Sequence, residues 1–272
     1  MMLLAEVAVW SIYAFGSILF LAQAASHEIG FFIGRRRAKQ TEDPGEREGV
    51  GLLVGGVLAL LAFVLALTLS FANERFGERR SGTLAEANAI GTAWLRAKAI
   101  GQPRGDEIAQ LLEKYAEVRR TFVTADYAVS HIDDLNQQTS ALQSSIWADV
   151  SAIVHEQPNP VTNSLMVALN DVFDMTTAER FAFEFRLPSQ LFWLLIGLSM
   201  LAMALLGYQQ ALRGPRLRII AALLGIVWTV VIVDILDLAS ARLGNFRTTA
   251  AAYEWTIQSF QSGTPTPAAQ KQ

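Results

Sequence analysis

An uncharged apolar run at residues 49–73, GVGLLVGGVLALLAFVLALTLSFAN, constrains the fold of this chain more than any other feature. A helix rises about 1.5 Å per residue, so this run is long enough to cross a hydrocarbon core of about 30 Å. Residues 74–80 follow without a proline or a turn cluster, and apolar residues at helical spacing resume from Leu84. We therefore expect one long helix that leaves the membrane and becomes the first helix of an extramembrane domain.

The composition is typical of an integral membrane protein. Only 17% of the 272 residues are charged, below the roughly 25% of an average soluble domain, and the apolar residues are concentrated in long runs. The sequence has no cysteine, which excludes disulfides, thiolate catalysis and cysteine-ligated metal sites, and its three histidines are scattered. The net charge of −3 gives no reason to expect a nucleic-acid partner. We predict no cofactor, no metal site and no enzymatic centre.

Three further apolar segments have membrane length. The first covers residues 3–26. It lacks a positively charged start and is longer than the apolar part of a signal peptide, so we expect a retained span rather than a cleaved signal. A basic loop at residues 27–48 follows it. The third span covers residues 187–212, and the fourth begins at Ile219 and ends near Ser240.

The segment 74–186 is predicted to form an extramembrane bundle of three or four helices. Breaks at residues 101–105 and 157–160 divide it, and between them residues 132–153 carry a nearly heptad seam that a single bundle can leave partly open. The predicted fold is an all-α integral membrane protein with two spans, a helical domain and two spans. Its predicted domain boundaries are 1–73, 74–186, 187–241 and a partly disordered tail at 242–272.

Two groups of charged residues are candidates for a functional role. Asp234 and Asp237 lie near the end of the fourth span, where a carboxylate at membrane depth often marks an ion path. The alternative, which we favour, is that the span ends at the headgroups and both side chains cap it, with Arg242 as a partner.

The second group consists of the acids and bases that alternate at residues 74–80. The simpler interpretation is a solvated rim of salt bridges, each worth a few tenths of a kcal/mol. If the helix is repeated around an axis, the same side chains form a ring of charge at a pore mouth. The residues of that ring are Glu74, Arg75, Glu78 and Arg80.

The run LALTLSFANERFGERRSGTLAEANAIGTAWLRA is similar to the hallmark of the bacterial bestrophin-like membrane proteins, a family of largely unknown function. Its most specific part is the block at residues 86–93, and residues 169–171, 186–188 and 235–237 also resemble the family. The likeness to true bestrophins, which are pentameric anion channels, is more distant. It rests on the arrangement of spans and on residues 75–80, which look like the stretch after the bestrophin pore helix.

The resemblance implies a homo-oligomeric channel, a pentamer if the likeness to true bestrophins holds, that conducts small anions through a pore lined by the second span. Counted back from Phe76, it implies an apolar neck at Ala59, Phe63 and Leu67, which lie four residues apart on one helical stripe. The alternative is that Phe63 and Leu67 pack against the first and third spans. The second function considered is a non-conducting membrane scaffold or sensor whose helical domain binds a partner. A third, an ion-coupled transporter, rests only on the two acids of the fourth span.

The orientation in the membrane is the prediction on which the sequence signals conflict. Basic residues are divided almost evenly between the two sides, with a slight excess in the short loops, which favours cytoplasmic loops. The resemblance to true bestrophins implies the opposite orientation. We follow the resemblance, because long translocated domains obey the basic-residue rule poorly. The segment 74–186 and both termini are thus predicted to be cytoplasmic, in a multi-pass protein of the inner cell membrane.

Overall fold

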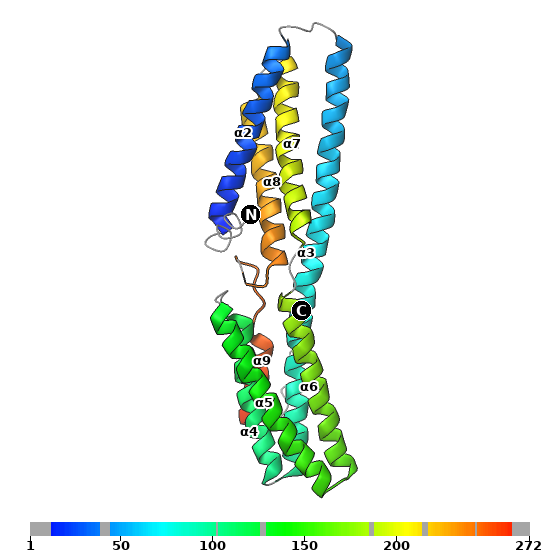
Figure 1. Cartoon of the computed structure of the whole chain (residues 1–272), viewed down its shortest axis with the longest axis vertical. Helices are drawn as coiled ribbons and strands as arrows, with labels where there is room; N and C mark the ends of the chain where they lie inside the picture. Colours follow the sequence, from blue (N-terminus) through cyan, green and yellow to red (C-terminus); the bar gives the residue numbers. More distant parts are fainter. Residues whose placement is uncertain are drawn as a thin grey trace. The chain divides into compact units, whose positions relative to one another are not determined.

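In the computed structural model of the chain, every regular element among the described residues is an α-helix (Figure 1). The helices are α2 (Ile12–Ala38), α3 (Pro44–Ile100), α4 (Arg104–Thr124), α5 (Val129–Glu156), α6 (Pro160–Glu184), α7 (Ser189–Arg213), α8 (Arg218–Ala239) and α9 (Ala251–Ser262). The structure describes residues 12–38, 44–101, 103–125, 129–184, 188–213, 217–242 and 244–262.

The chain forms two compact units, which are described separately below. The span unit comprises Met1–Arg75 and Arg186–Phe246, and the helical unit comprises Phe76–Phe185 and Arg247–Gln272. The long helix predicted from residue 49 onward is confirmed as α3, whose residues belong in part to each unit.

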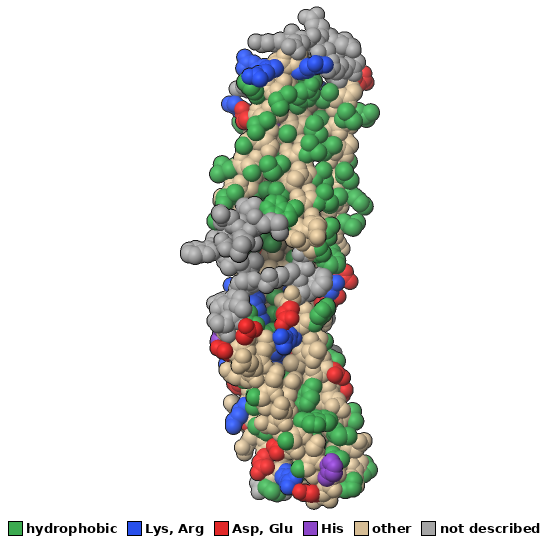
Figure 2. Space-filling view, in the orientation of Figure 1, with side chains coloured by type: hydrophobic (Ala, Val, Ile, Leu, Met, Phe, Trp, Pro, Cys, Tyr) green, Lys and Arg blue, Asp and Glu red, His purple; other side chains and the backbone are tan. Residues whose placement is uncertain are grey.

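Four helical stretches are long and apolar enough to cross a membrane, judged by length and composition. All four segments that the sequence predicts to be spans overlap these stretches, and the predicted third span corresponds to α7 within the third stretch. On the face seen in Figure 2, hydrophobic side chains cover much of the span unit. The four stretches are Ile12–Ala38, Glu48–Ile100, Pro160–Arg213 and Arg218–Ala239.

The first span ends later than the sequence predicts. Residues 1–11 lie outside the described part of the chain, but α2 continues to Ala38, so that His27 and the basic residues 35–37 belong to the helix rather than to a loop. The physical reason is that residues 27–38 contain no proline or turn cluster. Basic side chains in the last turn of a helix also favour its continuation, because they interact well with the helix dipole.

Glycines allow the backbones of α2 and α7 to approach closely. A Cβ atom on Gly30 would lie 1.8 Å from the carbonyl oxygen of Ala204, and one on Gly207 would lie 2.1 Å from that of His27. No side chain fits at these distances. Small residues serve this purpose at helix contacts in membranes, where close packing rather than the hydrophobic effect holds helices together.

In the helical unit, both predicted breaks are confirmed. α3 ends beside Gly101, whose positive φ of 82° favours glycine, and α4 begins at Arg104. The second break is capped by Asn159, whose Oδ1 accepts the backbone N–H groups of Val161 and Thr162 at 2.9 and 3.0 Å. Local Gly and Pro signals therefore place the helix boundaries correctly here.

The nearly heptad stripe at residues 132–153 is mostly covered by other helices of the same chain. It lies on α5, and most of its apolar side chains are buried within the chain, so it gives no separate reason to expect an oligomer. The buried members are Leu135, Thr139, Ile146, Val150 and Ile153.

The tail contains one more helix than the sequence predicts, α9, which belongs to the helical unit. Phe260 stacks on Trp94 of α3 with ring centroids 5.0 Å apart, and Thr256 Oγ1 donates to the Ala87 carbonyl at 3.2 Å. Its buried side chains, Tyr253 and Phe260, are spaced by two helical turns, a pattern too short to distinguish from a loop by sequence alone. The predicted disorder of the last residues falls outside the described part.

Candidate functional site

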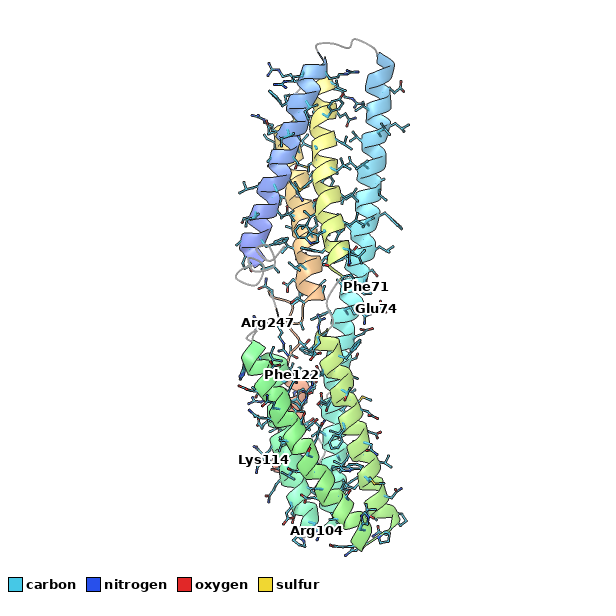
Figure 3. The ribbon with its side chains drawn as sticks, in the orientation of Figure 1. Phe71, Glu74, Arg104, Lys114, Phe122 and Arg247 are labelled. Atoms are coloured by element: carbon cyan, nitrogen blue, oxygen red, sulfur yellow. The ribbon has the colours of Figure 1, made fainter. Side chains whose placement is uncertain are left out.

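The helical unit contains a group of three fully buried ionisable side chains from three helices. Glu86 of α3, Arg119 of α4 and Glu179 of α6 each have 0% of their surface exposed. Arg119 Nε donates to Glu86 Oε1 at 2.7 Å, and its Nη2 donates to Glu86 Oε2 at 3.2 Å and to Glu179 Oε2 at 2.8 Å. The guanidinium lies over the ring of Phe122, labelled in Figure 3, with 4.3 Å between Cζ and the ring centroid.

Hydroxyl groups complete this cluster, which we call the buried ionic network. Tyr253 of α9 places its OH 2.7 Å from Glu86 Oε2 and 2.8 Å from Glu179 Oε2. Thr176 Oγ1 lies 2.7 Å from Glu86 Oε1, and Thr83 Oγ1 lies 2.5 Å from Glu179 Oε1. The network therefore joins α3, α4, α6 and α9 through a single set of charged and polar atoms.

An outer chain of hydrogen bonds extends the network to α5. Gln143 Nε2 donates to the Tyr115 hydroxyl at 2.8 Å, and this hydroxyl lies 2.7 Å from Thr176 Oγ1, which in turn contacts Glu86. All five helices of the helical unit thus contribute to one buried polar assembly. Such an assembly fixes the register of the helices, because any slip leaves buried polar atoms unpaired.

The two carboxyl groups titrate in opposite directions. Burial and the hydrogen bond and charge of Glu86 raise the pKa of Glu179 to about 8, against the opposing effect of Arg119. Burial alone would raise the pKa of Glu86, but its hydrogen bond with Glu179 and the Arg119 guanidinium outweigh burial and lower that pKa. Burial and the neighbouring carboxylates raise the pKa of Tyr253 well above its usual value. Of the two carboxyl groups, Glu179 therefore has the higher pKa.

The buried ionic network was not predicted from the sequence, although the sequence contains a signal for it, namely charged residues on apolar helical stripes. Glu86 lies on the apolar stripe of α3 with Ile90 and Ala93, and Arg119 lies on that of α4 with Leu112 and Phe122. A charge at a core position is expensive unless it is paired. Val118, an apolar residue at helical spacing with Leu112 and Phe122, is half-buried, whereas its neighbour Arg119 is fully buried.

The three predicted neck residues lie on one exposed face of α3. Phe63 is 63% exposed and Leu67 is 59% exposed, and Ala59 is exposed as well. The alternative that Phe63 and Leu67 pack against the first and third spans therefore does not hold within the single chain. The opposite side of the same helix is buried, at Val54, Leu61, Leu65, Thr68 and Ala72.

The four predicted pore-mouth charges also lie on α3. Glu74, Glu78 and Arg80 are exposed, whereas Arg75 is half-buried. The Arg75 guanidinium lies 5.0 Å from the ring centroid of Phe71, and both Phe71 and Glu74 are labelled in Figure 3.

The two acids of the fourth span have different surroundings. Asp237 is buried and accepts the backbone N–H groups of Asn245 at 2.8 Å and Phe246 at 3.3 Å, so it holds the loop that follows α8. A Cβ atom on Gly244 would lie 2.4 Å from this carboxylate. Asp234 is half-buried one turn earlier. The loop contacts of Asp237 give it a structural role at the end of α8.

A polar cluster that was not predicted from the sequence lies within the span unit. Gln23 Nε2 donates to Ser199 Oγ, and Thr229 Oγ1 donates to Gln23 Oε1, both at 3.2 Å. His27 Nε2 lies 3.3 Å from Gln210 Oε1. We call these five residues the span seam, since they link α2 with α7 and α8. A glutamine inside an apolar span is the sequence signal that marks it.

A comparison with protein families decides the relationship of the chain. A family model described as the Bestrophin-like domain matches residues 20–253. The chain belongs to the bestrophin-like family. The match confirms the resemblance seen in the sequence, and together with the four apolar stretches it describes a multi-pass membrane protein. The family is associated with channels rather than with enzymes.

The matched region includes every acidic and basic member of the buried ionic network, and Tyr253 is its last residue. Searches of curated proteins and of solved structures each found no match.

Proposed function

We propose that this bestrophin-like protein is an oligomeric membrane channel that conducts small anions through a pore lined by α3. The observation that carries the proposal is the division of α3 into two faces. One face is buried in the chain, and the opposite face presents Ala59, Phe63 and Leu67 to the surroundings. A helix that lines a pore needs such a face, which its own subunit leaves uncovered.

The chemistry of this face suits a gate. A ring of phenylalanine and leucine side chains around an axis excludes water and ions when it is narrow, and it conducts when it widens. The small residues Gly55 and Gly56 on the same helix have no other atom within 4 Å of an added Cβ, which leaves room for neighbouring copies. Family membership supports the choice of anions and of a cyclic assembly, five-fold as in true bestrophins.

Purified protein in liposomes tests the proposal. We expect anion efflux that depends on the protein and a reversal potential that follows the anion gradient. Because the sequence has no cysteine, Leu67→Cys can be modified alone with a charged, water-soluble thiol reagent, which should reduce this flux. Leu223→Cys is the matched control, since Leu223 on α8 is 58% exposed and outside the proposed pore. Modification that affects both variants equally would contradict the pore assignment.

The oligomer is tested separately by native mass spectrometry in mild detergent. A closed ring of copies, five if the bestrophin likeness extends to assembly, is the expected state. A protein that remains monomeric under all mild conditions cannot form a pore from one α3 helix.

The proposed location is the inner membrane, with the helical unit in the cytoplasm. Gln138 on α5 is exposed, so Gln138→Cys reports the side on which this unit lies. We expect an impermeant maleimide to label it in broken cells and not in intact ones. Labelling in intact cells would reverse the orientation.

A non-conducting scaffold or sensor is the second candidate function. It is favoured by large apolar side chains that the helical unit exposes, such as Phe181 on α6 and Trp255 on α9. Such side chains suit contact with a partner protein. Absence of flux from a correctly assembled oligomer would favour this function over the channel.

A further inference from the structure

The buried ionic network has more hydrogen-bond acceptors than its hydroxyl groups can serve. Tyr253 has one hydroxyl hydrogen, yet carboxyl oxygens of both Glu86 and Glu179 lie within 2.8 Å of its oxygen. Thr83 also has one, yet Glu179 Oε1 and the Arg79 carbonyl oxygen lie 2.5 and 2.9 Å away. If Glu179 were ionised, each hydroxyl would serve two acceptors with one hydrogen.

A single proton on Glu179 relieves one of these two hydroxyl groups, whichever oxygen carries it. On Oε1 it is donated to Thr83, which then donates its own hydrogen to the Arg79 carbonyl. On Oε2 it is donated to the Tyr253 oxygen, and Tyr253 then donates to Glu86. Glu86 is the carboxyl group that stays ionised, since Arg119 Nε and Nη2 donate one hydrogen bond to each of its two oxygens.

The balance of buried charges also favours a proton on Glu179. With both carboxyl groups ionised, the three fully buried groups carry a net charge of −1, and burial of an uncompensated charge is strongly unfavourable. With Glu179 protonated, the single positive charge of Arg119 balances Glu86. Among the described residues, Tyr253 on α9 contacts both carboxyl groups, Tyr115 on α4 reaches Glu86 through Thr176, and the member from α5 is the uncharged Gln143. On α3, the buried Arg79 lies one turn before Thr83.

We propose that Glu86 and Glu179 bind one exchangeable proton in common, and that this proton holds α9 on the helical unit. The inference does not depend on ion conduction. Tyr253 is the residue through which α9 reaches the two carboxyl groups, so loss of the proton places a surplus negative charge directly against it. A twelve-residue helix is not stable alone. Its attachment therefore depends on Tyr253, on the Phe260–Trp94 stack and on the Thr256–Ala87 hydrogen bond.

The direction of the pH effect follows from the raised pKa of Glu179. A group whose pKa is higher in the packed state than in the open state stabilises packing fully below its ordinary pKa, and this contribution is lost as the pH rises through the raised value. With a packed-state pKa of about 8, the equilibrium constant for opening should rise by up to about tenfold for each pH unit between pH 6 and pH 8, which is about a hundredfold in total, and level off above pH 8.

Hydrogen exchange of α9 peptides in the full-length protein measures this opening. Wild type is compared with Glu179→Gln at the same pH, so that the intrinsic exchange rate cancels. We expect the protection of wild type relative to Glu179→Gln to fall by up to about a hundredfold from pH 6 to pH 9, with the change complete near pH 8, because the amide cannot ionise. Glu254→Gln, an exposed acid on α9, should behave as wild type at both pH values. A wild-type to Glu179→Gln ratio that does not change with pH would overturn the proposal, as would loss of folding of Glu179→Gln at pH 6.

Infrared spectroscopy gives a second measurement that needs no intact variant. Wild type at pH 6 should show the carbonyl stretching band of a buried protonated carboxylic acid, and this band should disappear above pH 9. In Glu86→Gln the band should be missing even at pH 6, because Glu179 then ionises to balance Arg119. A wild-type protein without such a band at pH 6 has no shared proton, and the proposal fails.

Discussion

The helix α3 meets two different environments, one in each unit. In the span unit it buries an apolar stripe and exposes Phe63 and Leu67 on the opposite side. In the helical unit its buried stripe includes the charged residue Glu86, which is compensated within the chain by Arg119. The two parts of α3 therefore differ in whether the chain itself covers or pairs the side chains that most need a partner. The span unit leaves a face that only lipid, water or another copy can cover, whereas the helical unit pairs its buried carboxyl groups with a cation of its own.

The exposed side chains of α3 also differ in polarity between the two units. In the span unit the exposed neck residues are apolar, whereas in the helical unit the exposed residues of α3 combine polar side chains with two leucines. They include Ser81, Leu84, Asn88, Thr92 and Leu95. An apolar face suits a membrane-embedded gate, and a polar face suits contact with water. The proposed conduction thus concerns the span-unit part of α3, and the proposed pH-dependent packing of α9 concerns its helical-unit part.

The largest expected effect comes from breaking the buried ionic network at its only cation. Arg119→Met leaves the Glu86 carboxylate buried without its counter-charge, and we expect a loss of roughly 3–5 kcal/mol in the unfolding free energy of the helical unit. Arg120→Met is the control, because Arg120 forms an exposed pair with Glu117 that is worth at most about 1 kcal/mol. Thermal unfolding in detergent measures both. Similar losses in the two variants would show that the network does not hold the unit together.

The two faces of α3 are compared directly by truncating one leucine on each. Leu61 is fully buried, so Leu61→Ala should cost about 2–5 kcal/mol. Leu67 is mostly exposed, and Leu67→Ala should change stability by no more than about 0.5 kcal/mol. Unfolding midpoints of the purified oligomer provide the measurement. A large loss for Leu67→Ala would mean that its side chain packs in a protein interface rather than faces an open pore.

The close approach of α2 and α7 predicts a smaller effect within the span unit. Gly207→Ala forces a Cβ atom against the α2 backbone and should cost roughly 1–3 kcal/mol. Gly197→Ala, on the same helix, meets no atom within 4 Å and should be neutral or slightly stabilising. Equal stability of the two variants would contradict the observed packing of α2 on α7.

The smallest expected effect concerns the span seam. Gln23→Leu removes two hydrogen bonds at 3.2 Å between neutral groups, and such bonds in membrane proteins average about 0.6 kcal/mol each. We expect a loss of about 1 kcal/mol, several times less than for Arg119→Met. A loss as large as that of Arg119→Met would show that the span seam stabilises the fold as much as the buried ionic network does.

Local sequence signals predicted most of the helices and missed most of the buried polar contacts. The breaks at Gly101 and before Pro160 are visible because glycine and proline act on the backbone where they stand. The late end of α2 was missed because arginines at a membrane boundary fit a loop and a last helical turn equally well.

The buried ionic network was missed for a different reason. Glu86, Arg119 and Glu179 are separated in the sequence by 33 and 60 residues, and no local pattern says that they meet. The only sequence signal is that Glu86 and Arg119 occupy positions on otherwise apolar helical stripes. The neck residues were proposed from family resemblance, and their role as a pore lining stays a prediction.

Single-channel recording in planar bilayers tests the central claim most directly, namely that the exposed face of α3 lines an anion pore. The double variant Phe63→Ala, Leu67→Ala widens the apolar collar, and we predict larger or more frequent anion currents than in wild type. Leu223→Ala, which removes an equally exposed leucine from α8, should leave the currents unchanged. A folded and oligomeric double variant without any gain in anion current would contradict the pore assignment.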